Sequence, residues 1–167
     1  MNKPEIKELT NDNFKKYGAF YNMLDTSKAV KFGESPIEFC PDLIRSVLGN
    51  SCIASYSIVH ILKRPFIVDN SESHNYCEEV AMALDGDMLI HVGHVTGDGK
   101  PPVEDIEFFR VPKGTLISLR PGVWHHAPFA FGCESINVLI VLPERAYAND
   151  CIVYGMSKEE YINAPIS

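Results

Sequence analysis

The sequence predicts an all-β protein, a sandwich or barrel of short antiparallel strands with short flanking helices. From Ser51 onward, short apolar or alternating runs are separated by breaks rich in Gly, Pro, Asp and Asn. Few helical patterns lie between these runs, and a parallel sheet would need them as crossovers. The length of 167 residues suits one domain with a single sizeable core.

The segment before the predicted barrel is expected to hold short helices. Thr10 can cap a helix near residues 11–17, and Gly18 fits as its left-handed stop. A proline at a first helical turn, followed by an apolar run and a closing Gly-Asn, predicts a second short helix over residues 41–50. An irregular segment that includes a strand pair is the alternative for residues 20–50.

Seven runs are predicted as strands of a barrel that covers about residues 51–143. The Asp85-Gly86 pair between two of them is a hairpin signal. The run Ile136–Leu142 is apolar at every position but Asn137, which predicts a strand buried on both faces. The predicted strands are Cys52–Leu62, Phe66–Val68, Glu79–Leu84, Met88–Val95, Ile106–Val111, Thr115–Leu119 and Ile136–Leu142.

The C-terminal tail, residues 144–167, is predicted to carry one short helix. Ser157 and Glu160 have the spacing of a capping box, in which two side chains satisfy free backbone N–H groups at a helix start. The sequence contains no internal repeat, low-complexity tract or long linker. Residues 1–167 are therefore expected to form one domain.

Composition argues against several function classes. The net charge of −7 disfavours a nucleic-acid partner, which would need a basic stripe. The first residues hold no apolar stretch of a secretory signal, and the longest apolar run, Val138–Leu142, is far too short to cross a membrane. The five scattered cysteines lack a C-x-x-C pair. We expect reduced cytoplasmic thiols, mostly buried, with a nucleophilic Cys77 as the alternative.

The stretch Ser71–Gly86 carries the first set of potential metal ligands. Glu72 and His74 stand two residues apart, so on a strand they point to the same face. Glu79 follows five residues after the histidine, at the start of a predicted strand. These three side chains offer one imidazole and two carboxylates to a common point.

The stretch Gly114–His126 supplies a second imidazole. The turn at Pro121-Gly122 would deliver His125 to the mouth of the next strand. Carboxylate oxygen and imidazole nitrogen suit nickel, zinc, manganese or iron. We expect a divalent transition metal held by His74, Glu79 and His125, with Glu72 as a potential fourth ligand.

Neighbouring residues are assigned by strand alternation. Glu78 should face away from Glu79, and His126 away from His125. His126 is open to a structural, interface or acid–base role. Arg120, at the predicted pocket rim, is expected to hold a substrate anion. Trp124 is expected to be a wall or interface residue. No catalytic role is expected for three other histidines, His60, His91 and His94.

These spacings resemble the two motifs of the cupin superfamily, whose fold is a double-sheet jelly roll. Glu72 stands where the first histidine of the first motif usually is, and Arg120 where the second motif usually has proline. The matching residues are His74, Glu79 and Gly86 in the first motif and Gly114, Gly122 and His125 in the second. The resemblance implies a cupin-type double-sheet jelly-roll β-barrel.

A closer resemblance, to the ureidoglycolate lyase family, covers most of the chain. These are dimeric cupin-type proteins of purine and allantoin catabolism. The segments that carry the resemblance are Phe14 with Tyr17-Gly18, Val123–Phe129 and Asn149–Cys151. Ser73 stands at the place of the family's Arg, among the substrate-binding residues, and Glu79 at the place of its Gln.

The resemblance implies a metal-dependent lyase that cleaves ureidoglycolate, a small anionic substrate, to glyoxylate and urea. A base would take the carbinol proton while an acid protonates the departing nitrogen, and Glu72, Glu78 and His126 are the candidates. The family also implies a homodimer. Two alternatives stay open: a cupin lyase or isomerase for another small hydroxy acid or sugar, and a non-catalytic cupin that binds a small ligand.

Overall fold

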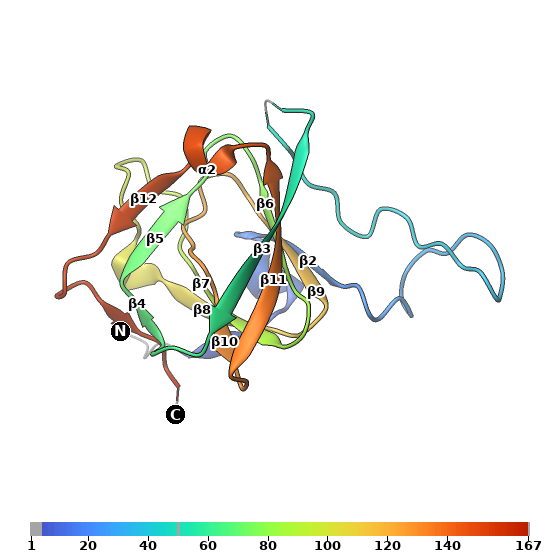
Figure 1. Ribbon diagram of the computed structural model, residues 1–167, viewed down its shortest axis with the longest axis horizontal. Coiled ribbons are helices and arrows are strands. Elements are labelled where there is room, and N and C mark those ends of the chain that lie inside the picture. The colour runs from blue at the N-terminus through green and yellow to red at the C-terminus, as the bar shows by residue number, and fades with distance from the viewer. Residues whose placement is uncertain (1–4, 50, 167) are drawn as a thin grey trace.

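The computed structural model describes residues 5–49 and 51–166, and two facing sheets make up its body (Figure 1). The four-stranded sheet has the order β1-β8-β7-β10 and contains β1 (Ile6–Glu8), β7 (Asp87–Val92), β8 (Glu107–Val111) and β10 (Phe129–Phe131). The five-stranded sheet has the order β2-β9-β6-β11-β3 and contains β2 (Gly18–Asn22), β3 (Ala54–Leu62), β6 (Glu79–Ala83), β9 (Thr115–Leu119) and β11 (Ser135–Pro143). Neighbouring strands are antiparallel, except that β1 is parallel to β8.

Two short strand pairs and a few short helical segments complete the chain. The pairs are β4 (Ile67–Val68) with β13 (Ile162–Asn163) and β5 (Asn70–Ser73) with β12 (Ile152–Gly155). The helical segments are α1 (Asn11–Phe14), α2 (Ala146–Asn149) and a 3-10 turn, η1 (Val103–Asp105). None of the helices described is long and apolar enough to cross a membrane. The predicted all-β jelly roll with short flanking helices is confirmed.

The main core lies between the two sheets. Alternate residues of the strands point into it, such as Ile136 and Val138 of β11 and Met88 of β7, all fully buried. A second core covers the outer side of the four-stranded sheet, where Leu89 packs beneath β4 and β13. On β6, Ala81 and Ala83 belong to the main core, so the space between the sheets is filled along most of that strand.

The N-terminal helix is shorter than predicted. The Thr10 side chain accepts the N–H of Asn13, and the Asn13 side chain accepts the N–H of Thr10, so the cap forms as expected. The prediction that Gly18 is a left-handed stop was wrong, because Gly18 is the first residue of β2. A Cβ at Gly18 would lie 1.8 Å from the carbonyl oxygen of Ser118, which explains the glycine.

Residues 23–49, here called the arm, extend away from the barrel (Figure 1). The predicted helix over 41–50 is absent from residues 41–49, and its predicted end at Asn50 lies outside the described residues. Asp42 has a φ of 55°, a left-handed conformation that breaks a helix at its first turn. The arm instead has the alternative structure, an irregular path with a bridge between Phe32 and Phe39.

The two large sheets also include β1 and β2, which precede residues 51–143, while β12 and β13 follow that range in separate two-stranded pairs. These strands are short or mixed in polarity, so the sequence has no alternating apolar pattern that would predict them. The predicted C-terminal helix is a turn. Glu160 accepts the Ser157 N–H at 2.8 Å, which is half of a capping box, but Tyr161 then leads into β13.

Strand β11 differs from its prediction on one face. Its inner residues, among them Ile136 and Val138, are fully buried as expected. Its outer residues Leu139 and Val141 are only half-buried, because none of residues 5–49 and 51–166 covers that side of the five-stranded sheet at these positions.

Glu107 on β8 is the centre of a partly buried ion-pair group. Its carboxylate accepts hydrogen bonds from Lys7, Lys16 and Tyr17. Burial alone would raise the pKa of Glu107, but these three donors outweigh it and lower the pKa to about 2. A carboxyl with a lowered folded pKa stabilises the fold above its unfolded pKa, about 4.3, and loses that contribution as the pH falls toward the folded value.

Glu107→Gln is expected to lower the free energy of unfolding by about 1–2 kcal/mol at pH 7, after allowance for solvent screening of the exposed lysines. Near about pH 2.5 the two proteins should differ far less, because most of the linkage contribution is lost there. Urea unfolding at both pH values measures the difference. A gap of constant size across this range would contradict the assignment.

Candidate functional site

The fold brings the two predicted motif stretches into direct contact. Glu72, at the end of β5, and His125 form an isolated β-bridge in which each backbone N–H donates to the other's carbonyl, at 2.5 Å and 2.8 Å. The N–H of Gly122 donates to the carbonyl of His74 at 2.6 Å. Gly122 has a φ of 78°, so the turn needs a residue that tolerates the left-handed region.

Four side chains converge inside the barrel, where β6 begins. Glu79 is the first residue of β6 and points inward, two positions before the core residue Ala81. Its Oε2 lies 3.0 Å from Nε2 of His74 and 3.3 Å from Nε2 of His125. Glu72, His74 and His125 each offer one ligand atom, and these atoms all lie within 4.8 Å of one another. The sequence predicted that Glu72, His74, Glu79 and His125 come together, and this geometry agrees with that prediction.

Both imidazoles are held in the orientation that a metal ligand needs. Nδ1 of His125 lies 2.8 Å from the carbonyl of Val123, and Nδ1 of His74 contacts the carbonyl of Asp150. A carbonyl oxygen only accepts, so each Nδ1 carries a hydrogen and each Nε2 faces Glu79. Metal-binding histidines commonly use their second ring nitrogen in this way.

The distances between donor atoms fit a bound transition metal. Bonds of about 2.1 Å place neighbouring ligand atoms about 3.0–3.4 Å apart in octahedral or tetrahedral geometry. The separations at Glu79 are 3.0 Å and 3.3 Å. Two imidazole nitrogens with one or two carboxylates suit zinc, nickel, manganese or iron. The residues therefore fit a divalent metal, which His74 and His125 would hold together with Glu72 or Glu79.

The electrostatics of the cluster keep its carboxylate ionised. Burial alone would raise the pKa of Glu79, but the charge of His125 and hydrogen bonds from both imidazoles lower it to about 2. Burial lowers the pKa of His125, yet Glu79 outweighs this effect and raises it to about 9. The pKa of His74 is likewise raised by its bond to Glu79 against the effect of burial. An anionic buried oxygen between two imidazoles is a ready ligand for a cation.

Glu72 lies beside the cluster, and His126 is close enough to Glu72 for its charge to affect the imidazole. Glu72 is half-buried, and one of its oxygens accepts the thiol hydrogen of Cys151 at 3.2 Å. Burial lowers the pKa of His126, while the nearby charge of Glu72 acts in the opposite direction. The imidazole of His126 is therefore mostly neutral at pH 7 and lies where Glu72 can stabilise its protonated form.

The structure contradicts the predicted acid–base role of Glu78. The carboxylate of Glu78 accepts hydrogen bonds from the Val47 N–H at 3.1 Å and the Ser118 hydroxyl at 3.0 Å. It faces the outer side of the sheet because adjacent strand residues point in opposite directions, as the alternation with Glu79 predicted. Glu78 therefore holds the end of the arm and does not reach the metal cluster.

Among the described residues, no side-chain hydrogen bond joins Arg120, Ser73 or Trp124 to the cluster. Arg120 is exposed, and among the described residues its guanidinium forms no hydrogen bond or ion pair. Ser73 is buried on β5 and alternates with Glu72, so it points to the opposite face. The indole N–H of Trp124 donates to Thr96 at 2.8 Å, which places Trp124 in the wall. The expectation for Trp124 as a wall residue agrees with this position.

Sequence reasoning missed the residues that support the cluster from behind. Asp150 supplies the carbonyl for His74, and its carboxylate accepts the N–H groups of Asn75 and Tyr76 at 2.7 Å and 2.9 Å. Its position 76 residues after His74 gives no local signal. The resemblance over Asn149–Cys151 singled out this segment, but it did not indicate its contacts.

A buried polar chain continues behind His125. The Ser71 hydroxyl donates to the His125 carbonyl at 3.1 Å, so it accepts from Nε2 of His91, 3.4 Å away. Burial, with the charge of His125 next, lowers the pKa of His91 to about 3, so this ring is neutral. The expectation that His91 lacks a catalytic duty is consistent with a supporting position.

Cys77 and Cys151 are expected to react slowly with thiol reagents. Burial, followed by hydrogen bonds to Asp150 and Glu72 respectively, raises the pKa of both thiols to about 12. At pH 8 only about one such thiol in ten thousand is ionised. Timed iodoacetamide labelling should therefore modify the exposed Cys52 first and the other two only after unfolding. Equal labelling rates in the folded protein would restore the nucleophile hypothesis for Cys77.

No model of a known protein family matches the chain, and no curated protein matches it in sequence. Among solved structures, it is similar to a dTDP sugar isomerase from Desulfovibrio desulfuricans G20, with a TM-score of 0.51 and 13% identity over 83% of this chain and 85% of that chain. That likeness and the strand order show a cupin-type jelly roll. The fold expected from the two motifs is confirmed.

Two further solved structures overlap more weakly. One is the oxalate decarboxylase from Bacillus subtilis, described with Mn(II) centres, with a TM-score of 0.42 and 16% identity over 61% of this chain. The chain spans 23% of the length of that decarboxylase. The other is a TDP-fucose-3,4-ketoisomerase from Campylobacter jejuni, with a TM-score of 0.40 and 13% identity over 80% of this chain and 84% of that chain.

Proposed function

We propose that the chain is a metal-dependent lyase that cleaves ureidoglycolate, a small hydroxy acid, to glyoxylate and urea. The observation that supports this most directly is the buried cluster of His74, Glu79 and His125, with their donor atoms at ligand spacing and both imidazoles fixed by backbone carbonyls. The substrate comes from the sequence resemblance, which is densest over Val123–Phe129. His125 belongs to both lines of support.

The chain's own residues supply the binding and the proton transfer. His74, Glu79 and His125 would hold the metal, which when bound supplies a Lewis acid for a hydroxyl and a carboxylate oxygen. His126, neutral and next to Glu72, takes the proton of the substrate hydroxyl. The C–N bond breaks as the oxygen's electron pair forms the carbonyl, and protonated His126 returns the proton to the departing urea nitrogen. Glu72 stabilises the charged imidazole between these two transfers.

The assay for this proposal is glyoxylate release from ureidoglycolate by the protein loaded in turn with nickel, zinc, manganese and iron. Turnover should require metal and should fall by at least about 100-fold in His126→Gln, the scale of a lost general acid–base group, with metal content unchanged. Absence of turnover with all four metals, in protein that binds them stoichiometrically, would reject ureidoglycolate as the substrate.

A second candidate is a lyase or isomerase for another small hydroxy acid or a sugar. The specific observation in its favour is that Ser73 stands where the resembled family has Arg and that Arg120 is exposed and forms no ion pair among the described residues. A substrate with fewer anionic groups places a smaller demand on such a site. The fold of this chain is also similar to that of a dTDP sugar isomerase over 83% of the chain. Incubation with a panel of hydroxy acids and nucleotide sugars, followed by NMR, would distinguish the two candidates.

A further inference from the structure

His74 has a second group of potential metal ligands beside its other ring nitrogen. Its Nε2 faces Glu79, whereas its Nδ1 faces Asp150 and contacts the carbonyl of that residue. The carboxylate of Asp150 in turn contacts the thiol of Cys77. One ligand atom each from His74, Cys77 and Asp150 lies within 4.8 Å of the other two. These three residues are here called the thiol cluster.

The spacing within the thiol cluster fits a tetrahedral metal ion. Zinc binds thiolate sulfur at about 2.3 Å and carboxylate oxygen at about 2.0 Å. At a tetrahedral angle these two bonds place sulfur and oxygen about 3.5 Å apart. The Sγ of Cys77 and the Oδ2 of Asp150 are 3.4 Å apart, with the thiol hydrogen between them. A cation that replaces this hydrogen therefore requires little movement of either side chain.

Backbone groups hold the carboxylate of Asp150 in place. Its Oδ1 accepts the N–H of Asn75 at 2.7 Å, and its Oδ2 accepts the N–H of Tyr76 at 2.9 Å. Oδ2 uses its second lone pair for the thiol of Cys77, so that lone pair becomes available to a cation when the thiol hydrogen leaves. Ligating carboxylates in metal sites are supported by hydrogen bonds of this kind.

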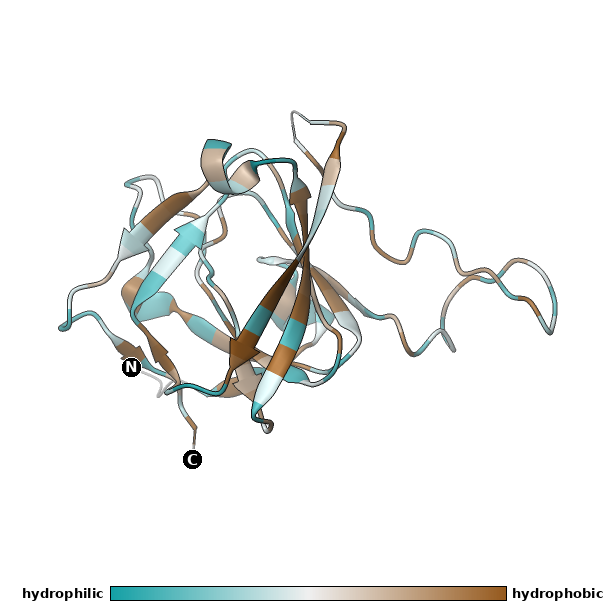
Figure 2. Cartoon of the chain, viewed as in Figure 1, coloured by the Kyte–Doolittle hydropathy of each residue, from teal (hydrophilic) through white to brown (hydrophobic). Residues whose placement is uncertain are grey.

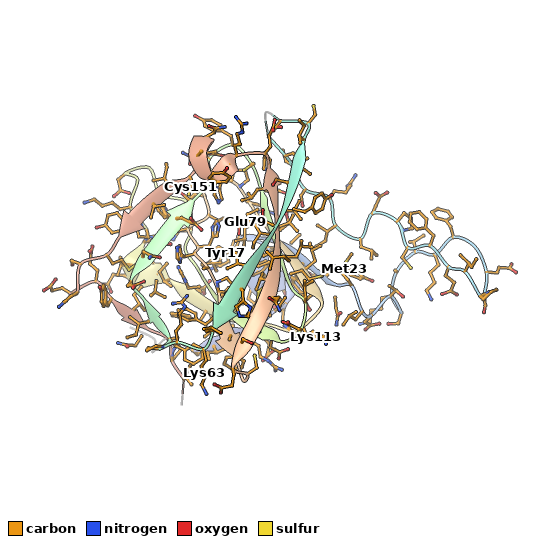
Figure 3. The ribbon with its side chains drawn as sticks, in the orientation of Figure 1. Tyr17, Met23, Lys63, Glu79, Lys113 and Cys151 are labelled. Carbon is orange, nitrogen blue, oxygen red and sulfur yellow. The ribbon has the colours of Figure 1, made fainter. Side chains whose placement is uncertain are left out.

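The thiol cluster lies in polar surroundings, and a hollow leads to it. β5, the strand that precedes His74, is hydrophilic along its length (Figure 2). A hollow of about 400 Å³ borders the cluster beside α2, and its lining includes Tyr76, Cys77, Asn149 and Asp150. Figure 3 shows Cys151 next to α2 and Glu79 further into the barrel. A cation can therefore reach the thiol cluster without crossing the main core.

We infer that the thiol cluster is a second metal site, which takes a thiophilic divalent cation such as zinc through Cys77 Sγ, Asp150 Oδ2 and His74 Nδ1. Thiolate ligands favour zinc over harder cations such as magnesium or manganese. Three protein ligands leave a fourth tetrahedral position for water. This site binds its cation whether or not the chain cleaves ureidoglycolate, because none of the proposed proton transfers involves Cys77.

Binding at the thiol cluster releases protons. Cys77 loses its thiol hydrogen and becomes a thiolate, because only the thiolate is a strong ligand. Nδ1 of His74 gives up its hydrogen and with it the contact to the Asp150 carbonyl. When Nε2 is free, the hydrogen moves there and faces Glu79. When Nε2 already binds a cation, the ring becomes a bridging anion, so the second cation is held more weakly than the first and is lost on dialysis.

Titration of the full chain with cobalt(II), followed by absorbance, tests the inference. A thiolate bound to cobalt gives a near-ultraviolet charge-transfer band, whereas imidazole and carboxylate ligands do not. The unmodified protein should develop this band as it takes up a second cobalt ion, and zinc should then abolish it, because zinc binds such sites more tightly than cobalt. Cys77→Ser should lack the band and should bind the second ion at least about 100-fold more weakly.

Cys151→Ser is the matched control, because the thiol of Cys151 also bonds a carboxylate, that of Glu72. This variant should keep the band. Absence of the band in the unmodified protein at saturating cobalt, or an equal band in Cys77→Ser, would overturn the inference. Loss of the band in Cys151→Ser alone would do the same, since it would place the thiolate beside Glu72.

A second variant keeps the test decisive if Cys77→Ser does not fold, which circular dichroism and the thermal midpoint would reveal. Asp150→Asn retains the thiol and an oxygen for the N–H of Asn75 or Tyr76, but it removes the ligand charge. Its band should require at least about 10-fold more cobalt, the lower end of the effect of a change at a metal site. A titration curve unchanged from that of the unmodified protein would exclude Asp150 and overturn the site.

Discussion

Glu79→Gln is expected to remove the bound metal, whereas Glu78→Gln, one residue earlier, leaves it in place. Glu79 Oε2 lies between the Nε2 atoms of His74 and His125, and an uncharged amide oxygen there is a much poorer ligand. Metal affinity should fall by more than about 100-fold, beyond the effect of losing a group that only supports a ligand. The proposed lyase activity should fall with it.

Elemental analysis after loading and dialysis measures the metal content of both variants. Glu78→Gln changes the same residue type by the same atoms one residue before β6, but its carboxylate bonds Val47 and Ser118 on the outer side. It therefore controls for a general effect on β6. Equal metal contents in the two variants would show that the metal, if bound, does not use Glu79.

Gly18→Ala is expected to destabilise the protein by about 2–4 kcal/mol, in the range of severe backbone clashes. The new Cβ would meet the Ser118 carbonyl oxygen at 1.8 Å and the Leu119 Cα at 3.2 Å. Backbone atoms cannot rotate away, so β2 would have to separate from β9 along the register that joins Gly18 to Leu119. The loss includes the hydrogen bonds of an edge strand of the five-stranded sheet.

Gly97→Ala is the matched control for this substitution. Gly97 has no atom within 4 Å of an added Cβ, and its φ lies outside the left-handed region. Its stability should change by less than about 0.5 kcal/mol, as for an ordinary surface substitution. Urea unfolding of the two variants beside the unmodified protein gives the comparison. Equal midpoints for both variants would mean that the β2–β9 pairing adapts to the extra atom.

The sequence was most informative where spacing alone determines direction. Alternation on a strand placed Glu79 inward and Glu78 outward, and the turn before His125 delivered it beside Glu72. Both are local rules, since two residues decide them. The barrel strands with strong apolar patterns, such as Thr115–Leu119, were found for the same reason.

The failures concern features that distant contacts determine. β5 reads Asn-Ser-Glu-Ser and is a strand only because β12, some eighty residues later, pairs with it. The helix expected after Pro41 depends on Asp42 adopting a right-handed conformation, and the structure has it left-handed. Tertiary context overrides propensity at each of these places.

The carbonyl of Asp150 and the thiol of Cys151 join the C-terminal segment to His74 and Glu72. That segment pairs with β5 through four residues of β12 and lies outside both large sheets, so it belongs to the part of the fold that opens at low free energy. Each opening frees Nδ1 of His74 and the carboxylate of Glu72 from their partners while the barrel core stays intact. The rate of metal exchange should therefore be similar to the rate of amide hydrogen exchange in β12. Both rates should be much higher than the rate of global unfolding.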